Sequence, residues 1–243
     1  MAREDSLALL ARGEIPERYR LNIGTIGTDG QKRLLEARVA IVGAGGLGGT
    51  IIELLARQGV GFMRIIDDDS FTLHNLNRQL LATERTVGMN KAAVATARVA
   101  EVNSEVETHA VPARLNEDNA TELLSDMNVI VDALDTINCR LLLCRMAQRL
   151  KIPLVHAAIA GFTGQVGTIL PSGPGLEKIY KTTSGLDKGI ETVLGNPAAT
   201  PALAAAIQAQ EVVKLLTGMG ETLSHKLLYF DTELNIYELL NLG

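Results

Sequence analysis

The residues of this chain best suited to chemistry are cations and carboxylates: Arg78, Lys91, Asp67, Asp69 and Asp132. Cations can neutralise the phosphates of a nucleotide, and an acid directly after a strand suits a ribose hydroxyl. Asp132 can hold Mg²⁺ through oxygen, with phosphates and water completing the coordination. This set of side chains fits reaction at a triphosphate and contains no obvious pair for general acid–base catalysis.

A glycine-rich segment precedes these residues. Gly43, Gly45 and Gly48 match the pattern G-x-G-x-x-G, directly after the apolar run 39–42 and before apolar residues at helical spacing. Glycine permits a tight turn, close approach of backbone to phosphate and close packing of helix on strand. Because a helix start offers free N–H groups to an anion, these glycines and Gly46 are predicted to bind a nucleotide. The pattern alone leaves NAD, FAD, S-adenosylmethionine and ATP open.

The loop after the second predicted strand separates these alternatives. Residues 63–67 end in the acid that an NAD site requires. An NAD site leaves four later polar residues unexplained: Asn75, Arg78, Gln79 and Lys91. Each of them alone suits a solvated polar loop. Together they predict a triphosphate site, in which the cations supply positive charge and the two amides orient phosphates.

A carboxylate substrate is compatible with these groups. The C-terminal carboxylate of a polypeptide is ionised at neutral pH, so its attack on the α-phosphorus of ATP needs no general base. The obstacle is the approach of one anion to another, which calls for alignment, cationic groups and a metal ion for the departing pyrophosphate. Arg78, Lys91 and Asp132 are therefore the candidate catalytic residues.

The elements that position these residues alternate along the chain. From residue 39 to residue 166, apolar runs alternate with helical stretches, of which the clearest are 90–103, 116–127 and 136–150. This order predicts an α/β, Rossmann-like fold with a mostly parallel sheet flanked by helices. A further helix and two antiparallel C-terminal strands are predicted at 201–216, 226–230 and 234–239.

The chain is predicted to form a single domain over residues 1–243. Residues 1–36 read as an N-terminal arm that has too few apolar stretches for a core of its own and must dock on another surface. Residues 171–197 are rich in Gly, Ser, Thr and Pro, and a loop of this length is usually functional.

The sequence resembles the ThiF/MoeB/HesA family of ubiquitin-activating-enzyme-like adenylyltransferases. That family carries Asp-x-Asp, then Asn-x-x-Arg-Gln and a lysine, and this chain matches with Asp67, Asp69, Asn75, Arg78, Gln79 and Lys91. A second family motif, D-x-x-D-[NT]-x(3)-R, is matched from Asp132 to Arg140, and Glu17-Arg18-Tyr19 matches the family's N-terminal arm. The resemblance covers nearly the whole chain.

The resemblance implies an ATP- and Mg²⁺-dependent enzyme that adenylates the C-terminal glycine of a small ubiquitin-like carrier protein ending in Gly-Gly. It implies sulfur-carrier activation for molybdopterin- or thiamine-type pathways, with Asp132 as the Mg²⁺ ligand. It also implies a homodimer, and a crossover loop at 171–197 that lies over the tail of the carrier.

The chain departs from the family at the zinc site. Many members carry two Cys-x-x-Cys pairs that bind structural zinc. This chain has only Cys139 and Cys144, on one predicted helix and not where a pair is expected, so no zinc is expected. Neighbouring leucines favour burial of at least one of these cysteines.

Two further departures concern the crossover loop and the arm. Some relatives use a cysteine of the crossover loop to form a covalent intermediate with the carrier, whereas this loop carries Ser184, which suits an ordinary loop. The family pattern R-Y-x-R-N places at Leu21 an arginine that reaches the ATP of the partner subunit. Arg18 or Arg20 is the candidate replacement, although a surface role suits either.

The composition of the chain limits which classes of partner are expected. A net charge of −5 argues against tRNA or another polyanion, and no nucleic-acid partner is expected. No apolar run reaches the roughly 18 residues of a membrane span, so no membrane partner is expected. An acidic start without a signal core, together with few cysteines, predicts a cytoplasmic location.

Three alternatives stay open. A relative of the same fold can activate another carboxylate or modify a tRNA base, and an NAD oxidoreductase shares the glycine pattern. A nucleotide-binding scaffold without turnover is also compatible with Leu21 and with the missing cysteines.

Overall fold

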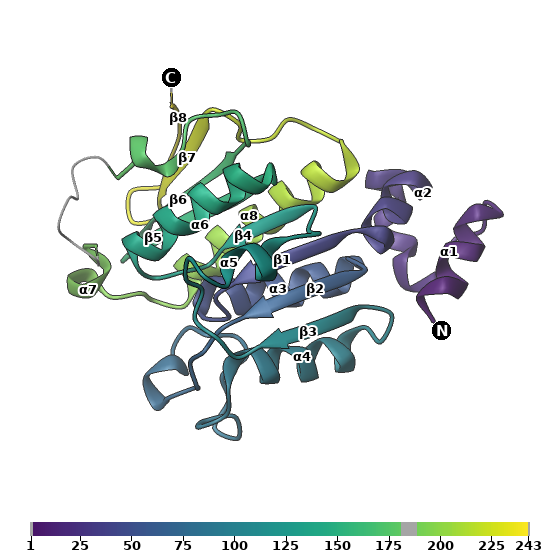
Figure 1. The fold of residues 1–243 in the computed structure, drawn as a ribbon, viewed down its shortest axis with the longest axis horizontal. Helices are drawn as coiled ribbons and strands as arrows, with labels where there is room; N and C mark the ends of the chain where they lie inside the picture. Colours follow the sequence, from purple (N-terminus) through teal and green to yellow (C-terminus); the bar gives the residue numbers. More distant parts are fainter. Residues whose placement is uncertain (1, 181–188, 243) are drawn as a thin grey trace.

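A computed structural model describes residues 2–180 and 189–242. Within these residues, one sheet of 8 strands has the order β3-β2-β1-β4-β5-β6-β7-β8. Strands β1 to β5 run parallel and β6 to β8 run antiparallel (Figure 1). The strands are β1 (Arg38–Val42), β2 (Phe62–Ile66), β3 (Glu107–Val111), β4 (Val129–Asp132), β5 (Leu154–Ala160), β6 (Thr163–Ile169), β7 (Lys226–Asp231) and β8 (Ile236–Asn241). The predicted fold class is confirmed.

Helices cover both faces of the sheet, because the strand residues alternate between two hydrophobic clusters. Val39 and Ile41 pack with α3 (Gly46–Gln58), α4 (Lys91–Val102) and α8 (Ala199–Thr217). Ala40 and Val42 face the other way and pack with α5 (Ala120–Leu124) and α6 (Ile137–Leu150). Figure 1 shows α5 and α6 in front of the sheet and α8 behind it.

The N-terminal arm docks at the amino ends of the strands, at the right of Figure 1. It comprises α1 (Arg3–Ala11), η1 (Glu17–Tyr19) and α2 (Arg20–Glu36). The Tyr19 side chain is fully buried, and its hydroxyl donates to Glu105 at 3.2 Å. Burial raises the pKa of Tyr19 to about 12, so this hydroxyl stays protonated. The arm therefore packs on its own subunit.

Element boundaries differ from the predictions where side chains compete with the helical backbone. The helix predicted at 116–127 is observed only as α5, because the Asn116 side chain accepts from the N–H groups of Asp118 and Asn119 before it. Strand β3 was not predicted, because its mixed polar and apolar residues lack a clear period.

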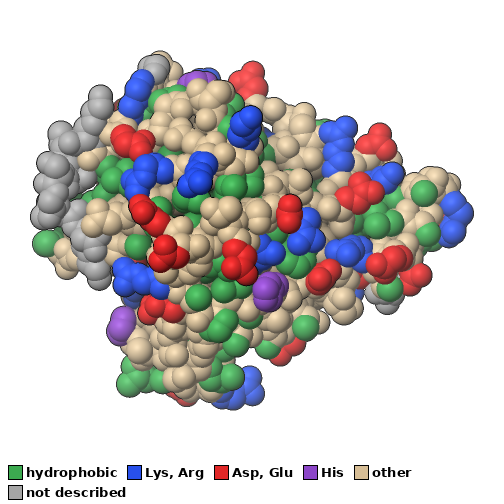
Figure 2. Space-filling model, in the orientation of Figure 1, with side chains coloured by type: hydrophobic (Ala, Val, Ile, Leu, Met, Phe, Trp, Pro, Cys, Tyr) green, Lys and Arg blue, Asp and Glu red, His purple; other side chains and the backbone are tan. Residues whose placement is uncertain are grey.

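The predicted loop 171–197 contains two short helical segments, η3 (Leu176–Lys178) and α7 (Glu191–Leu194). Residues 181–188, including Ser184, lie outside the described part of the chain. On the face drawn in Figure 2, acidic and basic side chains are interspersed. No described helix has the length and apolar character needed to cross a membrane.

Candidate functional site

A cavity of about 500 Å³ opens at the carboxyl ends of β1, β2 and β4. This edge of a parallel sheet is where α/β folds bind ligands. Backbone from Gly43 to Leu47 forms one wall, and the polar side chains that line the cavity include Asp67, Asp69, Arg78, Gln79, Lys91 and Asp135. Residues that lie far apart in the sequence thus meet where the nucleotide site was predicted.

The glycine loop turns from β1 into α3 with geometry that only glycine permits. Gly43 has φ +98°, and a Cβ on it would collide with the Ala133 carbonyl. A Cβ on Gly48 would collide with the Gly43 carbonyl, so Gly48 serves close packing of helix and loop and does not line the cavity. Gly45 and Gly46 line the cavity, and α3 begins at Gly46 with its N–H groups near the opening.

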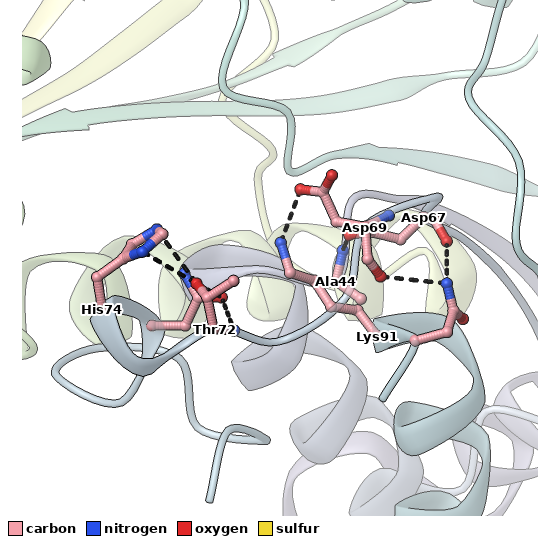
Figure 3. Close-up of polar contacts among 8 residues, drawn as sticks. Ala44, Asp67, Asp69, Thr72, His74 and Lys91 are labelled. Carbon is pink, nitrogen blue, oxygen red and sulfur yellow. Dashed lines mark hydrogen bonds and ion pairs between the residues drawn. The ribbon is translucent and has the colours of Figure 1, made fainter. Parts of the chain in front are cut away.

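Asp67 fixes the position of the glycine loop (Figure 3). One carboxylate oxygen accepts from the Ala44 N–H at 2.6 Å, and the other accepts from the Asp69 N–H at 2.9 Å. Burial raises the pKa of Asp67, while these hydrogen bonds and Lys91 favour the charged form. The carboxylate therefore ties β2 to the glycine loop at the wall of the cavity.

Lys91 is held at the first position of α4 (Figure 3). The Asn90 side chain caps this helix by accepting from Ala93 at 3.0 Å, and the Lys91 N–H donates to the Asp69 carbonyl at 2.9 Å. The Lys91 Nζ lies 2.9 Å from the Asp69 carboxylate, and its side chain is only 8% exposed. A nearly buried ammonium group thus faces the cavity with one carboxylate partner.

The segment between β2 and α4 positions the remaining predicted residues. Arg78 lines the cavity, and its Nη1 donates to the Asn77 side chain at 2.9 Å. Gln79 also lines it, and the Gln79 Oε1 is buried without a partner among the described residues. The Asn75 side chain instead accepts from the Thr72 N–H at 3.0 Å and shapes the turn η2 (Leu73–Asn75). Asn75 does not line the cavity, in contrast to its predicted contact with phosphates.

Asp132 does not lie where a Mg²⁺ ligand was predicted. Its side chain is fully buried, accepts from His156 Nδ1 at 2.7 Å and from the Leu134 N–H at 3.0 Å, and is absent from the cavity wall. The reason is register: Asp132 pairs with His156 across β4 and β5, so its carboxylate points at a strand neighbour. Asp135, the second acid of the same motif, is exposed and lines the cavity.

A second cavity of about 220 Å³ adjoins the first. Four residues line both: Asp135, Arg140, Ile159 and Glu191. Its wall combines small residues of β5 and β6, Ala158, Ala160 and Gly164, with larger side chains such as Tyr180 and Tyr229. Its volume is less than half that of the first cavity and suits an extended peptide segment rather than a folded module.

Three residues of the cavity walls were not predicted from the sequence. Arg114, Asn196 and Glu191 line the first cavity from segments that the motifs do not include. Arg140 was visible only as the last position of the second motif. No local spacing signals these residues, because β3, α6 and the segment before α8 converge on the site only in the folded chain.

The two cysteines have different surroundings. Cys144 is fully buried, its sulfur accepts from the Leu176 N–H at 3.4 Å, and burial raises its pKa to about 11. The burial predicted for at least one cysteine is confirmed. Cys139 is half-buried and lines the first cavity, 3.8 Å from Arg114 Nη2. The expectation of no zinc stays a prediction.

Comparisons with known proteins agree with this geometry. The model of the ThiF family matches residues 19–242. The SAMP-activating enzyme E1 of Haloferax volcanii is 39% identical over 85% of this chain and 77% of that protein. The sulfur carrier protein adenylyltransferase of Thermus thermophilus is 35% identical over 85% of this chain and 79% of that protein. The adenylyltransferase and sulfurtransferase MOCS3 of Culex quinquefasciatus is 36% identical, and the chain spans 48% of it.

Solved structures share the fold. PaaA superposes with a TM-score of 0.80 at 25% identity, over 93% of this chain and 82% of PaaA. Escherichia coli MccB, solved with ATP, superposes with a TM-score of 0.81 at 23% identity, over 94% of this chain and 72% of MccB. The agreement of fold, glycine loop and extended sequence match shows that this chain belongs to the ThiF family.

Proposed function

We propose that this protein uses ATP and Mg²⁺ to adenylate the C-terminal glycine carboxylate of a small ubiquitin-like sulfur carrier protein ending in Gly-Gly. The relatives above are adenylyltransferases and activating enzymes, and two of them are named for the sulfur carrier or SAMP on which they act. Molybdopterin- or thiamine-type sulfur transfer is the pathway class that this activity serves.

The observation that carries the proposal is the junction of two cavities. The larger offers glycine backbone and the cations Arg78 and Lys91, which suit a triphosphate. The smaller is lined by small residues such as Ala158 and Gly164 together with larger ones such as Tyr180 and Tyr229, and its volume of about 220 Å³ suits a short extended tail. Because the cavities share Asp135 and Arg140, a carboxylate at the end of the tail would meet the nucleotide there.

The reaction follows from these positions. A carboxylate oxygen of the tail attacks the α-phosphorus of ATP, and the bond from that phosphorus to the bridging oxygen of the β-phosphate breaks as pyrophosphate leaves with its electron pair. Arg78 and Lys91 offset the negative charge that gathers on the phosphates. No side chain has to accept a proton, because the attacking carboxylate is already ionised.

The surroundings of Asp132 and Asp135 indicate which of the two carboxylates can bind Mg²⁺. Asp132 does not fit, because one of its oxygens accepts from His156 on β5 and the other accepts from the Leu134 N–H just after β4. Asp135 fits, because it is exposed in the cavity wall at the junction. Bound there with phosphate and water ligands, Mg²⁺ would supply positive charge for the departing pyrophosphate.

Assembly and location belong to the same proposal. We infer a cytoplasmic homodimer, and the support for the dimer is the N-terminal arm. Leu21 at the start of α2 is 94% exposed, the largest exposed fraction among the large apolar side chains of the described residues. Within one protomer, Arg18 donates to the Val102 carbonyl at 3.0 Å and Arg20 lies 3.6 Å from Glu17. Neither arginine lines the cavity of its own subunit.

A second candidate is activation of a different carboxylate. MccB shares the fold and was crystallised with MccA and AMPCPP. The higher identity to sulfur carrier enzymes favours the first candidate, 35% for the Thermus enzyme against 23% for that MccB structure.

Pyrophosphate exchange into ATP tests the proposal. Purified protein, Mg²⁺ and labelled pyrophosphate are incubated with a panel of ubiquitin-like sulfur carriers and, in parallel, with MccA. Exchange that requires one of the carriers supports the proposal. Exchange with MccA alone supports the second candidate, and ATP binding without any exchange identifies a scaffold.

A further inference from the structure

A buried chain of polar groups lies behind the junction of the two cavities. Its first member is the Asp132 carboxylate, which accepts from His156 Nδ1 at 2.7 Å; both side chains are fully buried. Because Nδ1 donates to Asp132, the other ring nitrogen of neutral His156 is an acceptor. Asp132 thus selects one tautomer of the imidazole ring.

The chain continues to the wall of the second cavity. The Tyr180 hydroxyl lies 3.3 Å from His156 Nε2, and Arg140 Nη1 donates to the same hydroxyl at 3.1 Å. Tyr180 therefore donates to the imidazole and accepts from the guanidinium. Burial raises the pKa of Tyr180, so its hydroxyl keeps the proton that this arrangement needs.

Arg140 is the member of this chain that reaches both cavities. It is nearly buried, and its Nη1 and Nη2 also donate to the carbonyls of Ala157 and Leu134 at 2.8 and 2.5 Å. These contacts leave the Nε–H and one Nη2–H without an acceptor among the described residues. Two donors on adjacent nitrogens match the two oxygens of a carboxylate.

Before any substrate binds, the Asp132 carboxylate offsets the charge of the Arg140 guanidinium, and the Glu191 carboxylate, which lines both cavities, adds negative charge near Arg140. Burial beside Arg140 lowers the pKa of His156, and Arg140 together with His156 lowers the pKa of Asp132. The buried row of polar groups therefore holds one carboxylate (Asp132), one neutral imidazole (His156) and one guanidinium (Arg140). Asp132 keeps Arg140 charged in a buried place without occupying the remaining donors of its guanidinium group.

We propose that Arg140 binds the carboxylate of the acyl substrate at the junction of the cavities, and that Asp132, His156 and Tyr180 are positioning residues that hold Arg140 there. The inference rests on the proposed function. It places the attacking carboxylate between the tail cavity and the nucleotide cavity. It also gives Asp132 a role behind the site rather than at the metal.

Exchange kinetics with the carrier that supports turnover test this proposal. Tyr180→Phe removes the link to His156 while leaving both charges in place. It is expected to raise the KM for carrier about fivefold, and Arg140→Lys is expected to raise it about tenfold or more, because a lysine has no planar fork. The KM for ATP is expected to change less than about twofold in both variants, since neither removes a predicted triphosphate ligand.

A double variant tests whether Tyr180 affects carrier binding by positioning Arg140 or only by stabilising the fold. If Tyr180 acts through Arg140, adding Tyr180→Phe to Arg140→Lys changes the KM for carrier little further. Tyr237→Phe on the exposed strand β8 is the matched control and is expected to leave both KM values unchanged.

Each outcome decides one question. An unchanged carrier KM in Arg140→Lys, or equal rises in the KM values for carrier and ATP, would overturn the inference while the proposed function stands. Additive effects of the two substitutions would overturn the positioning role of Tyr180. Wild-type protein that shows no exchange with any carrier would instead overturn the proposed function, and the inference with it.

Discussion

At the scale of single residues, the proposed chemistry depends on where two cations are held. Lys91 is fixed by the cap of α4 and by Asp69, and Arg78 is fixed by Asn77. Both line the first cavity. Each cation is therefore held by its own polar partner, Asp69 for Lys91 and Asn77 for Arg78.

Removing either cation is expected to slow catalysis with little effect on folding. Lys91→Ala and Arg78→Ala are each expected to cut carrier-dependent pyrophosphate exchange about 100-fold or more, the scale of losing one charge-stabilising group. Lys32→Ala and Arg85→Ala change exposed residues outside the cavity and serve as matched controls. Near-normal exchange in both cavity variants would remove these residues from the site.

Substitution of the two acids of the second motif, Asp132 and Asp135, is expected to affect different properties of the protein. Asp135→Asn keeps the fold and raises the Mg²⁺ concentration needed for half-maximal exchange, because it removes an exposed metal ligand. Asp132→Asn lowers the melting temperature, because it leaves Arg140 without its buried countercharge. Magnesium titrations and thermal melts distinguish them, with Asp118→Asn as an exposed control. A magnesium effect confined to Asp132→Asn would restore that residue as the ligand.

The buried imidazole also predicts a pH dependence of stability. Because the pKa of folded His156 is lowered, the unfolded chain binds a proton more readily as pH falls below about 6.5, and folding stability is lost in that range. The lowered pKa of Asp132 removes further stability only below about pH 4. Melting temperatures between these two limits should fall less steeply with pH in His156→Gln than in wild type. Exposed His109→Gln should follow wild type, and identical slopes in all three proteins would contradict the assignment.

At the scale of elements, motif residues were predictable where a local pattern dictates the backbone. The glycine loop and the cap of α4 stand at the ends of their elements, so Gly45, Gly46, Asp67 and Lys91 line the cavity. Asp132 could not be placed from its motif, because the register of β4 against β5 decides whether the last strand residue faces a neighbour or the cavity. The walls contributed by Arg114 and Asn196 depend on long-range convergence that no local spacing encodes.

The glycine loop gives a test at this scale. Gly48→Ala is expected to lower the melting temperature and weaken ATP binding together, because its Cβ would meet the Gly43 carbonyl. Calorimetric titration with ATP and thermal melts measure both effects. Gly24→Ala on α2 adds a methyl group in open space and is the control. A Gly48→Ala protein that binds ATP normally would show that close packing of α3 is not required.

At the scale of the whole molecule, the question is whether one subunit completes the site of another. In one protomer the arm lies at the amino ends of the strands (Figure 1), whereas the residues that line the cavity stand at the carboxyl ends of β1, β2 and β4. An arm can therefore serve a cavity only if two subunits place these ends together. Leu21 and the arginines beside it are the residues that such a contact would cover.

Mixing two inactive variants tests this arrangement. A Lys91→Ala protein keeps its arm, and a protein with both Arg18→Ala and Arg20→Ala keeps its cavity and the buried Tyr19. Heterodimers are expected to regain exchange activity, because one subunit supplies an intact cavity and the other an intact arm. A monomer in sedimentation, or confirmed heterodimers without recovered activity, would limit the arm to packing on its own subunit.

The central claim is that this protein joins AMP to the C-terminal carboxylate of a sulfur carrier. The most direct measurement incubates protein, carrier and Mg²⁺ with ATP labelled at either the α- or the γ-phosphate, and follows the label on the carrier by mass spectrometry. The account predicts α-label on the C-terminal glycine of the carrier and all γ-label in pyrophosphate. A carrier that acquires γ-label, or no label while ATP is bound, would contradict it.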